Sequence, residues 1–159
     1  MPSHTTAVWA RLGRHAGRSG RIASPTRPRC APNLLSLAGT RTRHVGTDPA
    51  VERYDPDLWT DEFAFLSQPG QADIQSDLFY DYRTNVTAYP SWQAWLQKTQ
   101  PRLLVLWGRY DASFDISEPE AYRRDVPKAE VHVLDAGHFA LDTKADEIAA
   151  LVRGFLAIK

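Results

Sequence analysis

Two apolar runs in the second half of this chain constrain its fold more than any other feature. Residues 103–107 form a continuous apolar run, as expected of a strand buried on both faces, and residues 130–134 form a second strand-like run. Helical patterns follow them at about 118–125 and 144–158. Strand, helix, strand and helix in this order predict two parallel strands with right-handed crossovers. A two-stranded parallel sheet is not a stable domain, so these strands are expected to form the edge of a larger sheet.

One ionisable side chain follows each strand, four residues after it ends. Asp111 comes after the first strand and His138 after the second, each beyond a glycine. Neighbouring parallel strands lie about 4.8 Å apart and end at the same edge, where open α/β sheets place their sites. An aspartate beside a histidine orients the imidazole and stabilises its protonated form. We therefore predict Asp111 as the acid and His138 as the general base, with Asp115 as a possible substitute acid.

Residues 48–100 have a helical pattern rich in aromatic side chains. A first helix is expected over about 56–67 with Asp55 as its N-cap, and a second over about 71–86. A third is expected to start near Tyr89 and Pro90 and to run to about residue 99. Three consecutive helices with exposed aromatic faces suit a lid or cap that covers a site.

The N-terminal segment differs in charge from the rest of the chain. Residues 1–47 contain eight arginines and no acidic residue, whereas residues 48–159 contain 11 Lys and Arg against 19 Asp and Glu. Residues 1–33 are poor in apolar side chains, which predicts a basic, disordered tail over 1–47. Four interpretations of this segment remain: an artefactual N-terminus, a targeting peptide, a basic arm for nucleic acid, and a solvated tail. Residues 34–47 are either a short apolar anchor or the remains of a helix.

Several classes of function are disfavoured by composition. The apolar runs are far shorter than the roughly 18 residues of a membrane span, so no membrane partner is expected. The one cysteine, Cys30, cannot form an internal disulfide or a thiolate zinc site, and the five histidines lack metal-ligand spacing. No recognised nucleic-acid module accompanies the arginines, so nucleic acid is not the expected partner. A cytoplasmic protein without a metal fits these features.

Four segments resemble the C-terminal part of the α/β-hydrolase superfamily. They are L-V-L-W-G-R-Y-D-A-S-F, A-E-V-H-V-L-D-A-G-H-F-A-L, D-E-I-A-A-L-V-R-G-F-L and L-F-Y-D-Y-R-T-N-V-T-A-Y-P. The similarity is greatest to the branch of haloalkane dehalogenases and soluble epoxide hydrolases. It implies a partial α/β-hydrolase fold: a helical cap over 48–100, then the last strands and helices of the core over 101–159. It also implies that Asp111 and His138 are the triad acid and base, with no cofactor.

The resemblance does not extend to a nucleophile. That superfamily carries Ser or Asp on a turn of the form G-x-(Ser or Asp)-x-G after a strand. The nearest string here surrounds Ser19, has no strand before it and lacks the second glycine. Ser36, Ser113 and Ser117 also lack this context. We therefore expect a hydrolase truncated at its N-terminus and weakly active or inactive alone, with an open sheet edge that favours self-association.

The function expected from the resemblance is hydrolysis of an ester, an epoxide or a carbon–halogen bond in a small apolar substrate. The reaction would pass through a covalent intermediate. Tyr80, Tyr82, Tyr89 and Phe139 are candidates to line the substrate pocket, and the tyrosines are candidate proton donors to an epoxide oxygen. Two alternatives remain: a non-catalytic docking protein with a basic arm, and assembly with a separate chain that supplies the nucleophile.

Overall fold

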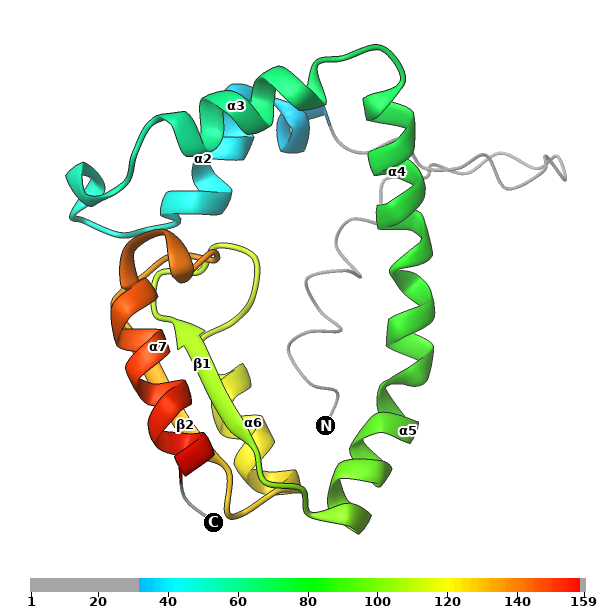
Figure 1. Cartoon of the computed structure of the whole chain (residues 1–159). Coiled ribbons are helices and arrows are strands. Elements are labelled where there is room, and N and C mark those ends of the chain that lie inside the picture. Colours follow the sequence, from blue (N-terminus) through cyan, green and yellow to red (C-terminus); the bar gives the residue numbers. More distant parts are fainter. Residues whose placement is uncertain (1–31, 158–159) are drawn as a thin grey trace, which may run out of the picture.

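The computed structural model describes residues 32–157, which curl so that the two strands lie on one side and the helices over residues 71–99 on the other (Figure 1). The expectations for residues 1–31, Ser19 and Cys30 included, lie outside the described residues. The elements in chain order are η1 (Pro32–Leu35), α2 (Leu37–Val45), η2 (Val51–Arg53), α3 (Asp57–Leu66), α4 (Gln71–Asp81), α5 (Arg83–Thr99), β1 (Leu104–Gly108), α6 (Glu118–Asp125), β2 (Glu130–Leu134) and α7 (Leu141–Ala157).

The predicted pair of parallel strands is confirmed. β1 and β2 pair in parallel from Leu104 opposite Glu130 to Gly108 opposite Leu134. Helix α6 lies on one side of this pair and α7 on the other (Figure 1). The expectation that the first strand is buried on both faces is wrong, because only Val105 and Gly108 in β1 are buried. The other side chains of β1 stay partly exposed, because no strand besides β1 and β2 is present among the described residues.

The helical region agrees with the sequence at its start and differs from it farther on. Helix α3 begins where predicted, and the Asp55 side chain accepts a hydrogen bond from the N–H of Asp57 at 3.0 Å. The next boundary falls at Tyr82 rather than after residue 86, and α5 continues through Pro90 instead of starting there. Proline removes one helical hydrogen bond, yet the helix resumes at once, and the Ser91 hydroxyl donates to a carbonyl of the same helix at 2.7 Å.

Residues 37–45 form a helix, so this part of the expected tail is ordered. The Ser36 hydroxyl accepts a hydrogen bond from the Gly39 N–H at 3.1 Å and caps α2, and Gly46 ends the helix with a φ of 60°. The helix buries Val45 in a cluster with Tyr54 and Trp59. The sequence did not decide between an apolar anchor and a helix for this segment, because its apolar residues are few and the stability of the helix comes from tertiary packing.

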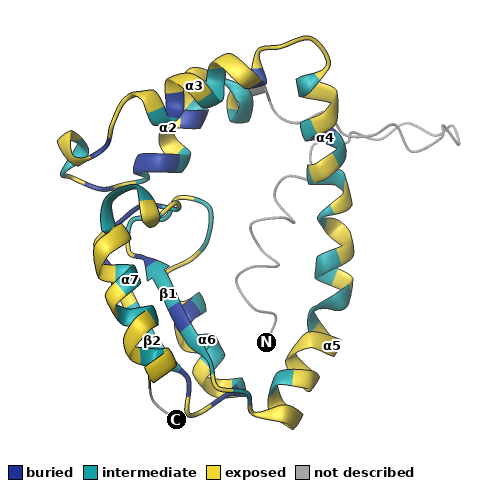
Figure 2. Ribbon diagram, viewed as in Figure 1, coloured by how far each residue is buried: buried dark blue, intermediate teal, exposed yellow. Residues whose placement is uncertain are grey.

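Burial is concentrated where the strands end. Figure 2 shows buried residues at the end of α2 and around the strands, whereas α4 and α5 are mostly exposed or intermediate. Val105 in β1, Leu134 in β2 and Val126 after α6 are also buried. Within residues 32–157 no helix has the length and apolar character needed to cross a membrane. The rigid part of the molecule is therefore the region that carries the ends of β1 and β2.

Candidate active site

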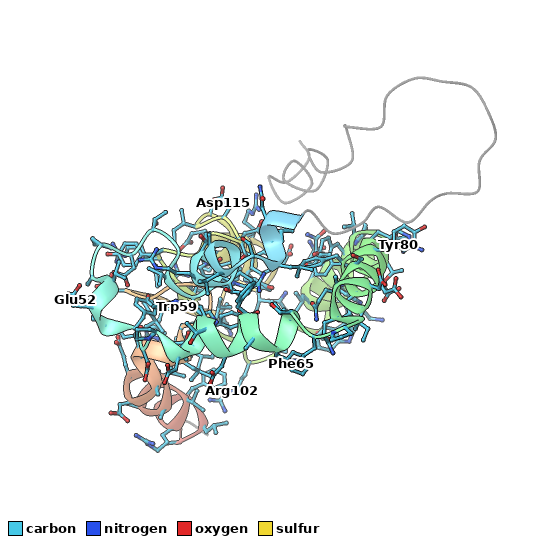
Figure 3. The ribbon with its side chains drawn as sticks, turned by 90° about the horizontal axis from the view of Figure 1, so that it is seen from above. Glu52, Trp59, Phe65, Tyr80, Arg102 and Asp115 are labelled. Atoms are coloured by element: carbon cyan, nitrogen blue, oxygen red, sulfur yellow. The ribbon has the colours of Figure 1, made fainter. Side chains whose placement is uncertain are left out.

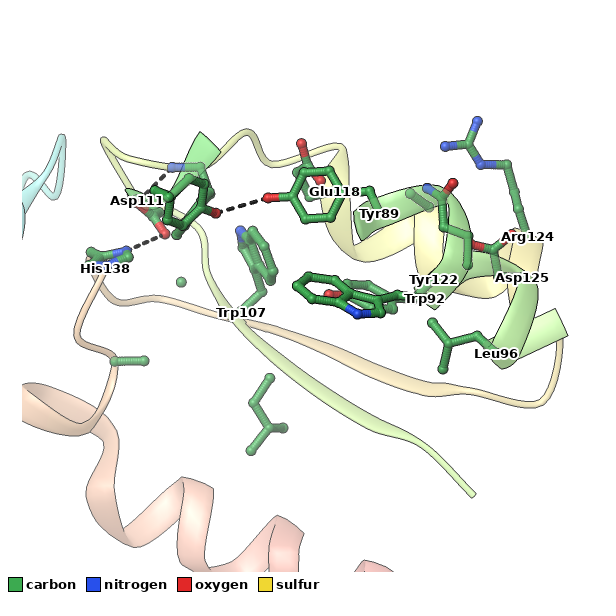
Figure 4. A pocket seen from close by; sticks show the side chains of 17 residues that line it. Tyr89, Trp92, Leu96, Trp107, Asp111, Glu118, Tyr122, Arg124, Asp125 and His138 are labelled. Carbon is green, nitrogen blue, oxygen red and sulfur yellow. Dashed lines mark hydrogen bonds and ion pairs between the residues drawn. The ribbon is translucent and has the colours of Figure 1, made fainter. Parts of the chain in front are cut away.

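The two predicted catalytic side chains meet at the carboxyl ends of the strands. Nδ1 of His138 lies 2.9 Å from Oδ2 of Asp111, and Figure 4 shows this contact at one end of a cavity. The pair forms because β1 and β2 end at one edge and each loop returns its side chain to that edge. The backbone loops are also bonded directly, since the Tyr110 N–H donates to the Ala136 carbonyl at 3.0 Å.

The surroundings of Asp111 favour its ionised carboxylate form. Its side chain is 6% exposed, and Oδ1 accepts hydrogen bonds from the N–H groups of Ser113 at 2.6 Å and Phe114 at 3.1 Å. Burial acts to raise the pKa of Asp111, but the hydrogen bond with His138 and these backbone donors outweigh it, and the pKa is lowered. An ionised Asp111 therefore accepts from Nδ1–H of His138, which leaves Nε2 as the basic nitrogen.

The His138 ring is held between two phenylalanines. Its centroid lies 5.4 Å from that of Phe114 and 4.8 Å from that of Phe139. Its side chain is 24% exposed, and Nε2 makes no hydrogen bond within residues 32–157. A ring fixed on one nitrogen and free on the other has the arrangement of a general base that can take a proton from a bound molecule.

Three glycines let the backbone segments around the pair approach closely. A Cβ on Gly108 would overlap the carbonyl oxygen of Gly137, and a Cβ on Gly137 would overlap that of His44. A Cβ on Gly46 would overlap the carbonyl oxygen of Tyr110. The loops that carry the acid and the base are thus packed against each other and against the end of α2. The sequence indicated Gly108 and Gly137 but gave no reason to expect the contact with α2.

Sequence reasoning also missed a buried polar network beside His138. The Tyr54 hydroxyl donates to Oδ2 of Asp48 at 2.8 Å and accepts from the Gly137 N–H at 2.9 Å. Burial raises the pKa of Tyr54, whereas backbone and side-chain hydrogen bonds outweigh burial and lower the pKa of Asp48. No local pattern reveals this network, because Tyr54 and Gly137, which share a hydrogen bond, are 83 residues apart in sequence.

A cavity of about 540 Å³ opens beside the pair (Figure 4). The Asp111–His138 pair is at one end, and α5 and α6 supply much of the wall. The hydroxyls of Tyr82 and Tyr89 are 2.9 Å apart, and burial, reinforced by Tyr82, raises the pKa of Tyr89 so that it stays protonated at neutral pH. The aromatic part of the wall consists of Tyr82, Tyr89, Trp92, Trp107, Phe114 and Tyr122.

The structure brings only some of the predicted pocket residues into this wall. Tyr82 and Tyr89 line the cavity, but Tyr80 and Phe139 do not. Tyr80 lies at the outer side of α4 in Figure 3, and its ring stacks beneath the guanidinium of Arg83 at 3.5 Å. Phe139 lies between two histidine rings, those of His44 and His138. A one-residue step along a helix or loop turns a side chain away from its neighbour's direction, which the sequence pattern did not resolve.

The remaining candidates have structural partners. The Asp115 side chain accepts from the Ser117 N–H at 2.8 Å near the start of α6, and His132 pairs with Glu130 at 2.7 Å. Ser36 caps α2, and no described serine hydrogen-bonds to His138. Within residues 32–157 no group of three or more His, Cys, Asp or Glu side chains is arranged to hold a metal ion.

Comparison with known proteins fits this arrangement. The chain is 43% identical over 118 residues to "Uncharacterized hydrolase YNR064C" of Saccharomyces cerevisiae, which covers 74% of this chain and 41% of that protein. It is 34% identical over 130 residues to "Poly(3-hydroxyalkanoate) depolymerase" of Ectopseudomonas oleovorans, covering 79% of this chain and 46% of that protein. The chain thus spans less than half the length of these relatives. The family described as "alpha/beta hydrolase fold" matches residues 41–145, and the chain belongs to this α/β-hydrolase fold family.

Proposed function

We propose that this chain carries the acid–base half of a hydrolase active site, with Asp111 and His138 as the triad acid and base. The observation that carries the proposal is the 2.9 Å contact between Asp111 Oδ2 and His138 Nδ1, with Nε2 left without a partner beside a cavity. The two relatives, a hydrolase and a depolymerase by name, support a hydrolytic reaction.

In this proposal His138 releases a covalent intermediate by activating water. Nε2 takes a proton from water, whose oxygen bonds to the carbonyl carbon of the ester that joins the substrate and the nucleophile. The C–O bond of that ester then breaks, and the leaving alcohol oxygen takes the proton from Nε2. Asp111 holds the ring in the required tautomer and stabilises the imidazolium that forms. The nucleophile would be Ser or Asp, and none of the described residues occupies its place beside Nε2.

The cavity favours a small, mostly apolar substrate. Its aromatic wall offers stacking and dispersion contacts. Polar side chains line it at the Asp111–His138 pair, at the Tyr82–Tyr89 pair and on α6, where Glu118, Arg124 and Asp125 lie. For an epoxide substrate, the protonated Tyr82 and Tyr89 hydroxyls would donate to the ring oxygen as the C–O bond opens. An ester or a carbon–halogen bond would not need these donors in the same way, so the tyrosines separate the three substrate classes.

We further propose that the chain alone is a slow catalyst. Loss of the nucleophile from a triad costs on the order of 10⁶ in rate, and loss of an oxyanion donor costs about 10²–10³. With neither group beside His138, only base catalysis of direct water attack remains. The expected turnover is therefore far below the range of about 1–10³ s⁻¹ that is usual for enzymes.

The test measures hydrolysis of a p-nitrophenyl ester, an aryl epoxide and a bromoalkane by the full chain. We expect slow hydrolysis that falls to the uncatalysed rate in His138→Gln and decreases in Asp111→Asn, because both changes remove the oriented base. His132→Gln is the matched control, since His132 pairs with Glu130 outside the cavity. Equal rates for the wild type and His138→Gln would contradict the base assignment, and turnover above about 1 s⁻¹ would contradict the slow-catalyst proposal.

The tautomer of His138 gives a second test that does not depend on turnover. In ¹⁵N-histidine-labelled protein at neutral pH, we expect Nδ1 to carry the proton and Nε2 to be the unprotonated nitrogen. Asp111→Asn should abolish this preference, because an amide can present a donor to Nδ1. A His138 ring with mixed tautomers in the wild type would remove the basis of the proposal.

A second candidate function is docking of another macromolecule. Large apolar side chains are exposed along α4 and α5, with Ile74 50%, Leu78 60% and Trp95 56% exposed. A docking protein would bind its partner unchanged in His138→Gln, and a functional basic arm would bind polyanions such as heparin in a salt-dependent manner. Hydrolysis that depends on His138, in a chain that binds neither a partner nor polyanions, would favour the hydrolase over the docking protein.

A further inference from the structure

We propose that Tyr54 and Asp48 are positioning residues for His138, acting through the backbone N–H of Gly137. This inference rests on the proposed function, because it assumes that His138 is the working base. It assigns a role to residues that lie outside the strands and their loops. Neither residue lines the cavity, so neither touches the substrate.

The contact is made at the residue directly before His138. The Gly137 N–H donates to the Tyr54 hydroxyl oxygen at 2.9 Å, and both residues are buried. Within residues 32–157 this hydroxyl is the acceptor for that N–H, and a buried N–H without a partner is strongly unfavourable. The bond therefore fixes the orientation of the Ala136–Gly137 peptide plane, one residue before His138.

Asp48 fixes the hydroxyl itself. Its side chain has no exposed surface, and its Oδ2 accepts the Tyr54 O–H at 2.8 Å. Its Oδ1 accepts the Ala50 N–H at 2.9 Å. With the hydroxyl hydrogen committed to Asp48, the Tyr54 oxygen presents a lone pair to Gly137, so the direction of the hydrogen bond is determined.

The same segment holds the His138 loop at a second point. The Arg53 guanidinium binds Oδ2 of Asp48 at 2.5 Å and donates to the Asp135 carbonyl at 3.2 Å. Asp135 and Gly137 are thus both bonded to the segment at 48–54, on either side of Ala136. The two hydrogen bonds go to Tyr54 and Arg53, which both bind the buried Asp48 carboxylate. They restrain the loop against the small rotations that would lengthen the His138–Asp111 hydrogen bond.

A Tyr54→Phe substitution tests this role because it keeps the ring and removes only the oxygen. Tyr80→Phe is the matched control, since Tyr80 contacts Arg83 through its ring on the outer side of α4. Both variants and the wild type are labelled with ¹⁵N and compared under conditions where tryptophan fluorescence shows them folded. The readouts are amide exchange at Gly137 and the tautomer of the His138 ring.

We expect Tyr54→Phe to speed Gly137 exchange by about tenfold or more and to weaken the preference for Nδ1–H on His138. Tyr80→Phe should change neither. If His138 keeps its tautomer and titration in folded Tyr54→Phe, Tyr54 is only structural and the inference is wrong. If Tyr54→Phe does not fold, Asp48→Asn is used instead, because it leaves the tyrosine in place and replaces one of the two acceptor oxygens that bind Ala50, Arg53 and Tyr54 with an amide donor.

The two proposals fail in different ways. Absence of the Nδ1–H tautomer in the wild type would contradict the proposed function itself. Its presence in the wild type together with its persistence in folded Tyr54→Phe, or in Asp48→Asn where Tyr54→Phe does not fold, would contradict only the positioning role. The hydrolysis assay adds a third readout, since loss of positioning predicts a lower rate in Tyr54→Phe at an unchanged substrate KM.

Discussion

At the scale of single residues, two aspartates stay ionised although their side chains are withdrawn from water. Asp48 is 0% and Asp111 is 6% exposed at the side chain. Burial acts to raise the pKa of both, but hydrogen bonds from backbone N–H groups and from neighbouring side chains lower it. The donors to Asp48 lie on its own segment, at Ala50, Arg53 and Tyr54, and they stabilise the fold of that segment. Asp111 accepts from its own loop and from His138 on the next loop, so it also joins the two loops.

The lowered pKa values predict a loss of stability in acid. A carboxyl group with a lower pKa in the folded chain contributes stability above its unfolded pKa of about 3.9, and this is lost as the pH falls through the folded pKa. We expect the free energy of unfolding, measured with urea and tryptophan fluorescence, to fall steeply below about pH 4. Asp48→Asn should lower it by about 1–3 kcal/mol at pH 7 and flatten this dependence.

The exposed aspartate Asp61 provides the control for this prediction. Asp61→Asn on α3 should leave both the stability at pH 7 and its decline in acid close to those of the wild type. A stability curve of Asp48→Asn parallel to the wild type through the acid range would contradict the assignment of the acid loss to this carboxylate.

At the scale of elements, the end of α2 packs against the loops that carry Asp111 and His138. Gly46 adopts a φ of 60° and lies against the Tyr110 carbonyl, and the Thr47 N–H donates to that carbonyl at 3.1 Å. The helix thereby contacts the loop that carries Asp111. The end of α2 is therefore joined to this loop by backbone contacts, not only by side-chain packing.

Three glycine-to-alanine substitutions distinguish the cost of a strained backbone conformation from the cost of steric overlap with a neighbouring segment. Gly46→Ala should destabilise the chain by more than about 2 kcal/mol, because it adds a steric overlap to the strain of a left-handed conformation. Gly70→Ala, with a φ of 84° and open space around it, should cost only about 1–2 kcal/mol. Gly154→Ala in α7, also in open space, should stabilise the chain by up to about 1 kcal/mol.

Denaturant unfolding of the three variants checks this order. Equal destabilisation by Gly46→Ala and Gly70→Ala would mean that the contact with Tyr110 gives way without cost. That result would contradict the view that α2 is fixed against the site.

At the scale of the whole molecule, the described sheet has two strands and therefore open edges. Large apolar side chains stay exposed near it, among them Val133 on β2 and Leu156 on α7. Open strand edges with apolar neighbours favour pairing with other chains. We propose that this chain self-associates through an edge of the sheet.

Sedimentation velocity over a range of concentrations measures this association. We expect Val133→Lys to weaken it, because a charge on the strand opposes edge pairing. Leu156→Lys is the matched control on a helix that does not form the edge, and it should have little effect. A stronger effect of Leu156→Lys would place the contact on α7 instead, and a monomer at all concentrations would contradict the proposal.

Much of the secondary structure and the placement of Asp111 beside His138 followed from local sequence patterns. Apolar runs of the right length predicted β1 and β2, and the parallel order placed Asp111 and His138 at one edge. Helix boundaries were less well predicted where signals conflict: Pro90 suggested a start but lies inside α5, because the flanking residues favour helix strongly enough to continue.

The sequence by itself determined which residues could be acid and base, because strand spacing and chain order already fix where two parallel strands end. Only the tertiary structure decided what surrounds them. The bond from Gly137 to Tyr54, the approach of Gly46 to Tyr110 and the inclusion of Tyr89 but not Tyr80 in the cavity wall depend on long-range packing. Such contacts join residues far apart in the chain, and no local pattern carries information about them.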